Sequence, residues 1–363
     1  MEPDIQQAPA EVRYAEDLAR LAAVDRGPKP KGWVLSPRAV RRFVLGDPDL
    51  GIVQKFYGDD SLVDRCIVSL MGQQGLMMVG EPGTAKSMLS ELLAAAISGD
   101  SRLVVQGSAG VIEDHLRYGW NYALLLAEGP SERALVPSPI LTAMRAGKIA
   151  RIEELTRCPP EVQDAMISLL SEKTVVIPEL GAGAEVRAVA GFNVIGTANL
   201  RDLGVNEMSS ALKRRFNFET VHPIADPVFE KRLVATQLRE RMADHPADVA
   251  MGDDVLDLLV SVFRDLRTGR TADGAAVDKP RSVMSTAEAV NVAQAAVLEA
   301  AYLDEGPVTG AHVGRQLRGV AFKDDGDDAR KLRAYADTIA QARAERSRAW
   351  AAFAKTVKAG LHG

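Results

Sequence analysis

Cysteine is almost absent from this chain: its 363 residues include two, Cys66 and Cys158. They lie far apart and match no metal-ligand spacing, so the sequence predicts no cysteine-based metal site. We expect both to be reduced, half-buried structural residues of a cytoplasmic protein.

An excess of positive charge is also lacking, since the formal net charge is −5 and the pI is about 5.7. No global basic field therefore favours nucleic acid. The first residues, MEPDIQQAPAEVR, are acidic and polar and do not resemble a secretory signal. No apolar run reaches the length that spans a membrane. What remains is an ordinary globular composition, with 47% apolar and 26% charged residues.

The central part of the chain alternates short apolar runs with helical patterns, which is typical of a parallel, doubly wound α/β sheet. One helix is clear, because Pro159 and Pro160 open it and apolar residues then recur at spacings of three and four from Val162 to Leu170. Strands are expected at 76–79, 102–106, 148–152, 192–197 and 217–221, after helices near 11–24, 36–46 and 59–73.

After residue 223 the pattern becomes helical throughout. Asp226 and Pro227 have the composition of a helix start, and Ser285 with Glu288 predicts a capping box. Arg346 interrupts the apolar stripe of the last helix, which favours packing on its own domain over a coiled coil. Helices are expected at 227–243, 253–266, 284–303, 309–321 and 327–358, with a polar loop at 267–280.

A glycine-rich loop between an apolar strand and an apolar helix is the strongest signal in the sequence. Its glycines would let the backbone approach phosphate oxygens, and the helix N-terminus would face the anion. Lys86 would reach the β- and γ-phosphates, and the Ser87 hydroxyl would ligate Mg²⁺. Ala85 stands where the pattern G-x-x-x-x-G-K-[ST] has its second glycine. The loop, GEPGTAKS, consists of Gly80, Glu81, Pro82, Gly83, Thr84, Ala85, Lys86 and Ser87.

A phosphate loop needs an acidic partner at the end of a neighbouring strand. Glu153 and Glu154 close the apolar run IARIEE, which Arg151 interrupts. Glu153 would hold Mg²⁺ through water, and Glu154 would orient the attacking water. The alternative is a pair of solvated glutamates at a helix start, where the macrodipole favours negative charge.

Polar side chains at three later positions would complete a nucleotide site. Asn199, at the end of the strand in FNVIGTAN, would position the same water; alternatively it is a turn residue. Arg214 or Arg215, at a helix end, would stabilise the charge on a neighbour's γ-phosphate; alternatively they are a surface pair. Arg281, at the start of a helix, would contact phosphate from the helical part; alternatively it is merely exposed.

On these residues the chain resembles MoxR-type AAA+ ATPases, the P-loop class with an insertion in the second core helix. The resemblance covers residues 40–322 and rests on GEPGTAKS, EELTRCPPEVQDAMISLLSEKTVVI, FNVIGTAN, LKRRF and PRS in the family's order and spacing. It implies ATP and Mg²⁺ as cofactors. It also implies site roles: Lys86 and Ser87 in Walker A, Glu153 and Glu154 in Walker B, Asn199 as sensor 1, Arg215 or Arg214 as arginine finger, and Arg281 as sensor 2.

The chain departs from the family at two places. Family members typically have Asp where this chain has Glu153, and an apolar residue where it has Arg151. These departures would alter the Mg²⁺ geometry and predict slow hydrolysis.

The resemblance also implies partners. Such proteins form homo-oligomeric rings, usually of six subunits, which remodel a protein substrate, often through a von Willebrand factor A-domain adaptor. Residues 111–140 predict a hairpin that interrupts a helix around Glu128-Gly129-Pro130, and 174–195 predict a hairpin with a glycine turn. These hairpins would face the ring pore; alternatively they only cap the sheet. We expect His115, Trp120 and Tyr122 to be packing residues.

The expected domains are an N-terminal extension and linker (1–50), an α/β nucleotide-binding core (51–224), a helical lid (225–326) and a C-terminal helix (327–363). The leading hypothesis is an ATP-hydrolysing ring motor that remodels a partner protein. A nucleotide-dependent scaffold with poor turnover is the first alternative. A P-loop kinase is disfavoured by Asn199, the arginine pair and Arg281, and a nucleic-acid motor is disfavoured by the acidic pI.

Overall fold

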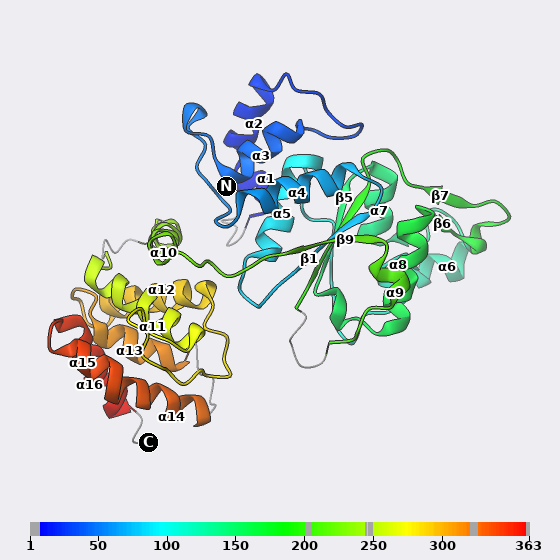
Figure 1. Cartoon of the computed structure of the whole chain (residues 1–363). Helices are drawn as coiled ribbons and strands as arrows, with labels where there is room; N and C mark the ends of the chain where they lie inside the picture. The colour runs from blue at the N-terminus through cyan, green and yellow to red at the C-terminus, as the bar shows by residue number, and fades with distance from the viewer. Residues whose placement is uncertain (1–7, 200–204, 244, 246–249, 320–325, 361–363) are drawn as a thin grey trace. The chain divides into compact units, whose positions relative to one another are not determined.

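The computed structural model describes residues 8–199, 205–243, 245, 250–319 and 326–360 (Figure 1). The chain divides into two compact units. The first consists of Met1–Glu81 and Ala85–His222, and the second of Pro82–Thr84 and Pro223–Gly363.

A parallel sheet forms the centre of the first unit, and its described residues give five strands in the order β2-β5-β8-β1-β9. All the expected strands are present, so the prediction of a doubly wound parallel α/β core is confirmed. Their bounds are β1 Gly75–Val79, β2 Val104–Gln106, β5 Ile149–Glu153, β8 Asn193–Ala198 and β9 Phe216–Thr220.

Helices cover both faces of this sheet, because alternate side chains of each strand enter different cores. Leu76 and Met78 of β1 pack on the side of helix α5 (Lys86–Ser98). Met77 and Val79 pack on the opposite side, with α7 (Pro139–Ala146) and α8 (Pro160–Ser171). Each fully buried side chain of this size stabilises the fold by roughly 1.5–3 kcal/mol.

Helices from the N-terminal part of the chain complete the α5 side. The helix expected near 11–24 is two helices, α1 (Ala10–Arg13) and α2 (Ala15–Val24), because Tyr14 leaves the helical region at φ −116° and ψ 28°. α3 (Pro37–Leu45) begins after Ser36, whose Oγ accepts from the Ala39 N–H at 3.3 Å. α4 (Asp60–Met71) follows the N-cap Asp59.

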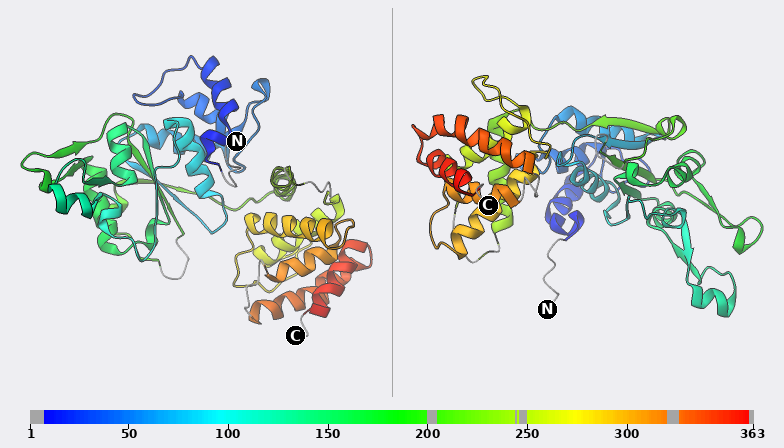
Figure 2. Two further views of the ribbon diagram at one scale, coloured as in Figure 1. Left: turned by 180° about the vertical axis from the view of Figure 1, so that it is seen from behind. Right: turned by 90° about the horizontal axis from the view of Figure 1, so that it is seen from below.

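Two insertions extend beyond the sheet on the same side of the first unit (Figures 1 and 2). β6 (Thr174–Val176) and β7 (Glu185–Arg187) form the expected hairpin, with glycines at positive φ in its turn. β3 (Tyr118–Trp120) and β4 (Leu135–Pro137) pair antiparallel. The Tyr118 hydroxyl donates to Glu179 of the other insertion at 2.9 Å.

The first insertion differs from its prediction at the tip. The apolar run before Gly129 is a helix, α6 (Tyr122–Glu128), and not a strand of the hairpin. Asn121 caps it by accepting from the Leu124 N–H at 3.2 Å. No residue of α6 is buried.

The described residues of the second unit form helices joined by loops. Asp226 caps α10 by accepting from the Val228 N–H at 2.9 Å, and the predicted capping box of Ser285 and Glu288 is present. The expected loop before α12 is confirmed, with one bridge between Arg270 and Ala276. The helices are α10 Pro227–Met242, α11 Asp253–Thr268, α12 Thr286–Tyr302, α13 Gly310–Leu317, α14 Gly326–Tyr335, α15 Gln341–Ala344 and α16 Arg348–Gly360.

The single helix expected over 327–358 is wrong. A π-helical turn (Ala336–Ala340) follows α14, and the chain reverses after α15 so that α16 packs back on it. Trp350 lies against Tyr335, and the Arg343 guanidinium lies 4.7 Å from the Trp350 ring centre. The reversal lets the apolar residues of α14 and α16 share one core with α11 and α13, as expected for packing on its own domain.

Both cysteines are free and fully buried, so the expectation of half-buried thiols is wrong. Burial raises the pKa of the Cys66 thiol to about 12. Among the described residues, no helix is long and apolar enough to cross a membrane.

Candidate nucleotide-binding site

The glycine-rich loop links β1 to α5, as the sequence predicts. Gly83 and Ala85 both have left-handed backbone, with φ of 74° and 65°. Turns of this kind let successive N–H groups converge on an anion. Ala85 is also the residue before the first turn of α5, whose N-terminus carries partial positive charge.

Ala85 should be strained, since left-handed backbone costs a residue with a Cβ about 1–2 kcal/mol. Ala85→Gly removes this strain but adds roughly 0.5–1 kcal/mol of unfolded-chain entropy. We expect the free energy of unfolding of the first unit to rise by about 0.5–1 kcal/mol, measured by denaturant titration. Ala19→Gly, on the exposed surface of α2, is the matched control and should lower it by a similar amount. Equal losses in both variants would contradict the strain.

Lys86 folds back over the loop that precedes it. Its Nζ donates to the carbonyl oxygens of Gly80 at 3.0 Å and Glu81 at 2.8 Å. The side chain is 7% exposed, so its ammonium is held at the loop and not in open solvent. A cation in this place can meet the phosphates that the loop would bind.

Glu153 lies at the centre of a buried polar cluster. Its Oε2 accepts from the hydroxyls of Ser87 at 2.6 Å and Thr197 at 2.7 Å. Its Oε1 accepts from the Ser90 hydroxyl at 2.6 Å and from Arg151 Nη2 at 2.8 Å. The residue is 5% exposed, and both oxygens have two donors.

Strand and helix periodicity explain this cluster. Arg151 and Glu153 are two residues apart on β5, so both face α5, and Ser87 and Ser90 are three apart on one side of α5. Burial raises the pKa of the Glu153 carboxyl, but the charge of Arg151 and the hydroxyl donors outweigh it and leave that pKa below its usual value. Glu153 is therefore ionised at neutral pH.

The Ser87 and Glu153 oxygens fit a magnesium site. The Ser87 hydroxyl donates its hydrogen bond to Glu153, which leaves the lone pairs of the Ser87 oxygen for a cation. Mg²⁺ prefers oxygen ligands and is commonly held by one or two carboxylates together with substrate phosphates. Within the described ranges no group of three or more His, Cys, Asp or Glu side chains could hold a metal, so no all-protein cage competes with this assignment.

Glu154 follows the end of β5 and turns away from the strand direction. Its φ is 55°, uncommon for a residue with a side chain, and such strain often lies at functional sites. Its N–H donates to Thr197 Oγ1 at 3.0 Å, so Thr197 connects both glutamates. Its carboxylate is one-third exposed and lies 3.0 Å from Arg157 Nε.

Asn199 comes directly after β8. Its Oδ1 is buried and has no hydrogen-bond partner among the residues that the structure describes. An unsatisfied buried acceptor costs about 1–3 kcal/mol, so this atom is poised to accept from a bound group such as water.

The two arginines after α9 (Ser210–Lys213) have different surroundings. Arg215 donates to the Ser171 hydroxyl at 2.8 Å and to the Ala211 carbonyl at 2.9 Å, so its partners lie on α8 and α9 and not on the phosphate loop. Arg214 is exposed, and its side chain forms no hydrogen bond or ion pair with the described residues.

Arg281 belongs to the second unit and lies in the loop before α12, so its expected place at a helix start is wrong. Its side chain is exposed. Its backbone N–H donates to Asp328 Oδ1 at 2.7 Å, and the Ser282 N–H donates to Oδ2 at 2.8 Å. Burial raises the pKa of Asp328, but these two N–H groups help to lower it overall. A role toward nucleotide stays a prediction.

Three members of the cluster have no role predicted from the sequence: Ser90, Arg151 and Thr197. Ser90 contacts both Arg151 and Glu153, and its three-residue spacing from Ser87 is the signal that would have found it. Arg151 was recognised only as a departure from the family pattern, although its place two residues before Glu153 puts both on one strand face.

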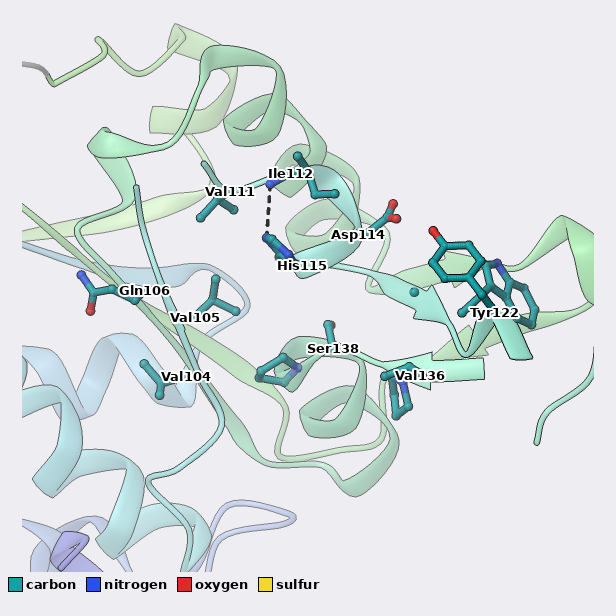
Figure 3. Close-up of a pocket in the computed structure, with 14 residues that line it drawn as sticks. Val104, Val105, Gln106, Val111, Ile112, Asp114, His115, Tyr122, Val136 and Ser138 are labelled. Atoms are coloured by element: carbon teal, nitrogen blue, oxygen red, sulfur yellow. Dashed lines mark hydrogen bonds between the residues drawn. The ribbon is translucent and has the colours of Figure 1, made fainter. Parts of the chain in front are cut away.

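A separate cavity of about 500 Å³ lies beside β2 and the β3–β4 hairpin (Figure 3). His115 Nδ1 accepts from the Ile112 N–H at 3.3 Å, and Trp120 packs edge-on against Tyr118. Tyr122 is 72% exposed and His115 is exposed as well, so the expectation that these two residues pack is wrong. No phosphate-loop residue lines this cavity.

The parallel sheet, the loop between β1 and α5, and the buried Glu153 cluster define a P-loop ATPase domain. Residues 75–216 match the AAA domain (dynein-related subfamily), and residues 229–357 match the YehL-like AAA+ ATPase C-terminal domain. The chain belongs to the YehL-like family of AAA+ ATPases.

The chain is similar to two further bacterial proteins. "Uncharacterized protein YehL" of Escherichia coli (strain K12) is 49% identical over 332 residues, which cover 91% of this chain and 91% of the relative. An uncharacterized protein of Staphylococcus aureus (strain USA300) is 25% identical over 195 residues, which cover 54% of this chain and 69% of the relative.

Similarity to solved structures is weaker. A crystal structure of NtrX from Brucella abortus in complex with ADP is 14% identical, with a TM-score of 0.48, and the match covers 84% of this chain and 67% of that one. A score of this size carries no argument about function.

Proposed function

We propose that this protein hydrolyses ATP with Mg²⁺ at the loop between β1 and α5, and that it uses the energy to remodel a partner protein. One observation carries the catalytic part: Ser87 and Glu153 are joined by a 2.6 Å hydrogen bond, and Thr197 connects Glu153 to Glu154. The phosphate loop and both glutamates are thereby parts of one hydrogen-bonded site.

Each part of the site has a distinct task in this proposal. Loop N–H groups and Lys86 bind the β- and γ-phosphates, and Ser87 with Glu153 holds Mg²⁺, which neutralises phosphate charge when bound. Glu154 accepts a proton from the attacking water. The unsatisfied Asn199 Oδ1 accepts a hydrogen bond from that water and fixes its direction.

The assembly we propose is a homo-oligomeric, MoxR-like ring, hexameric by family habit, in which an arginine of one subunit reaches the γ-phosphate of the next. An exposed Arg214 without a side-chain partner among the described residues supports this, because a finger must be available to a neighbour. In the same proposal Arg281, a residue of the second unit, contacts a phosphate of the nucleotide.

A protein substrate, recruited by a von Willebrand factor A-domain adaptor, follows from the same family resemblance and makes the activity chaperone-like. The first insertion supports contact with a partner, since no residue of its helix α6 is buried. The acidic net charge argues against nucleic acid, and free cysteines fit a reducing cytoplasm.

A nucleotide-binding scaffold with weak hydrolysis is the second candidate. The buried ion pair of Arg151 and Glu153, with 2.8 Å between Nη2 and Oε1, favours it, because a compensated carboxylate attracts Mg²⁺ less. Both candidates require the phosphate loop to bind ATP.

Lys86→Ala should weaken ATP binding by about a hundredfold or more, since it removes hydrogen bonds from a cation to phosphate. A calorimetric or fluorescent-nucleotide titration of the purified full chain measures this. The matched control is Lys55→Ala, a buried lysine of the same unit whose ammonium lies 2.7 Å from Asp17. Unchanged ATP affinity in Lys86→Ala would remove Lys86 from the site, and loss in both variants would indicate misfolding.

A further inference from the structure

Arg151 is a buried cation beside the proposed magnesium site, and the mechanism above gives it no task. It is 8% exposed. Its Nε donates to the Ser90 hydroxyl at 2.9 Å, its Nη1 to the Ser101 carbonyl at 2.9 Å, and its Nη2 to the Ser87 carbonyl at 3.1 Å. The planar guanidinium is thus fixed by α5 and by the segment before β2, independently of Glu153.

This fixed guanidinium determines how the Glu153 carboxylate lies. Oε1 is held by Arg151 and Ser90, and Oε2 is thereby directed to Ser87 and Thr197. A glutamate side chain has more rotamers than an aspartate, so it needs such a constraint to present one oxygen reproducibly.

The guanidinium also changes the charge that a cation meets. Arg151 and Glu153 together are neutral, whereas Glu153 alone would carry −1. Both are buried, so water screens their interaction little and the compensation extends to the neighbouring Ser87 oxygen. A divalent cation at Ser87 therefore gains less from Glu153 than it would from an unpaired carboxylate.

We propose that Arg151 is a positioning residue that orients the Glu153 carboxylate toward Ser87 and, by neutralising its charge, makes nucleotide binding depend only weakly on Mg²⁺. This rests on the proposed function, since it takes the nucleotide with Mg²⁺ as the ligand of the site. Arg151 has two separable effects, one geometric and one electrostatic.

The electrostatic effect is tested without catalysis, by measuring the affinity for ADP in excess Mg²⁺ and in EDTA. The dissociation constant in EDTA divided by the dissociation constant in Mg²⁺ reports how much Mg²⁺ strengthens ADP binding, and this quotient is called the Mg²⁺ ratio. Arg151→Gln removes the charge but keeps a donor, and should raise this ratio about tenfold or more over wild type. Arg151→Lys keeps the charge, so its ratio should stay near that of wild type.

The geometric effect is tested with the lysine variant. Lysine has a compact ammonium in place of the planar guanidinium with its fixed donors, so it should not hold the Glu153 carboxylate in one orientation. Arg151→Lys should therefore slow ATP hydrolysis by about tenfold, although its Mg²⁺ ratio is retained. Lys55→Gln, which removes another buried cation of the first unit, is the control and should change neither the ratio nor the rate.

An unchanged Mg²⁺ ratio in a folded Arg151→Gln protein would overturn the electrostatic part. The same change of the ratio in Arg151→Gln and in Arg151→Lys would also overturn it, because the lysine variant keeps the charge. If Arg151→Gln does not fold, the lysine variant still decides, because a wild-type rate would overturn the positioning role. No ADP binding by wild type in either buffer would instead refute the proposed function.

Discussion

Glu154→Gln should bind ATP normally and release phosphate at least about a hundred times more slowly than wild type, the size of a lost general base. The amide keeps the shape of the side chain, and the backbone bond of Glu154 to Thr197 is unaffected. What is lost is the ability to accept a proton from water. Because binding persists, the variant should also accumulate as an ATP-bound assembly, visible by size-exclusion chromatography with nucleotide analysis.

Glu161→Gln is the matched control, since this exposed glutamate lies in the first turn of α8 and its side chain forms no hydrogen bond or ion pair with the described residues of the site. Its rate should equal that of wild type. Normal hydrolysis by Glu154→Gln combined with loss in Glu153→Gln would show that the base and the metal-binding residue are exchanged relative to our assignment.

Mixing two inactive variants should restore activity if the arginine acts between subunits. Arg215→Ala should retain ATP binding and lose turnover, because a guanidinium finger acts on charge that develops in the transition state. In rings mixed from Arg215→Ala and Glu154→Gln, some interfaces pair an intact Glu154 with an intact Arg215 of the next subunit. Partial phosphate release should return, and wild-type specific activity should rise with protein concentration until assembly saturates.

Arg214→Ala, tested in parallel, decides which arginine is the finger. The structure supplies arguments for both: Arg215 is held in place by Ser171 and Ala211, whereas Arg214 is exposed and unpaired among the described residues. No recovery in either mixture, with activity independent of concentration, would place the whole site in one subunit and favour the kinase alternative.

The core sheet could be predicted because parallel strands buried on both faces are short, continuous apolar runs between helical patterns. Periodicity failed for α6, since seven mostly apolar residues fit a strand as well as a helix and Asn121 decides the outcome as an N-cap. Periodicity also failed near Glu345, where the single helix expected over 327–358 is interrupted. The segment from 327 to 358 contains no proline or glycine, and the reversal follows from the shared core of α14 and α16 together with Ser347, whose Oγ accepts from the Trp350 N–H at 3.5 Å at the start of α16.

The placement of the candidate-site residues could be predicted where it depends on a loop pattern or on a strand end. Lys86, Ser87 and Glu153 follow from the loop pattern and from a carboxylate at a strand end. The role of Arg151 could not be predicted from the sequence alone. It depends on hydrogen bonds to Ser87, Ser90 and Ser101, which lie on other elements. A charged residue inside an apolar strand gives no indication of its partners until those elements are placed.

Phosphate release from ATP by the purified full chain, with Mg²⁺ and with EDTA, tests the central claim most directly. The account predicts turnover that requires Mg²⁺ and disappears in Lys86→Ala. Tight ATP binding without phosphate release at any protein concentration would contradict it and identify the protein as a nucleotide-binding scaffold.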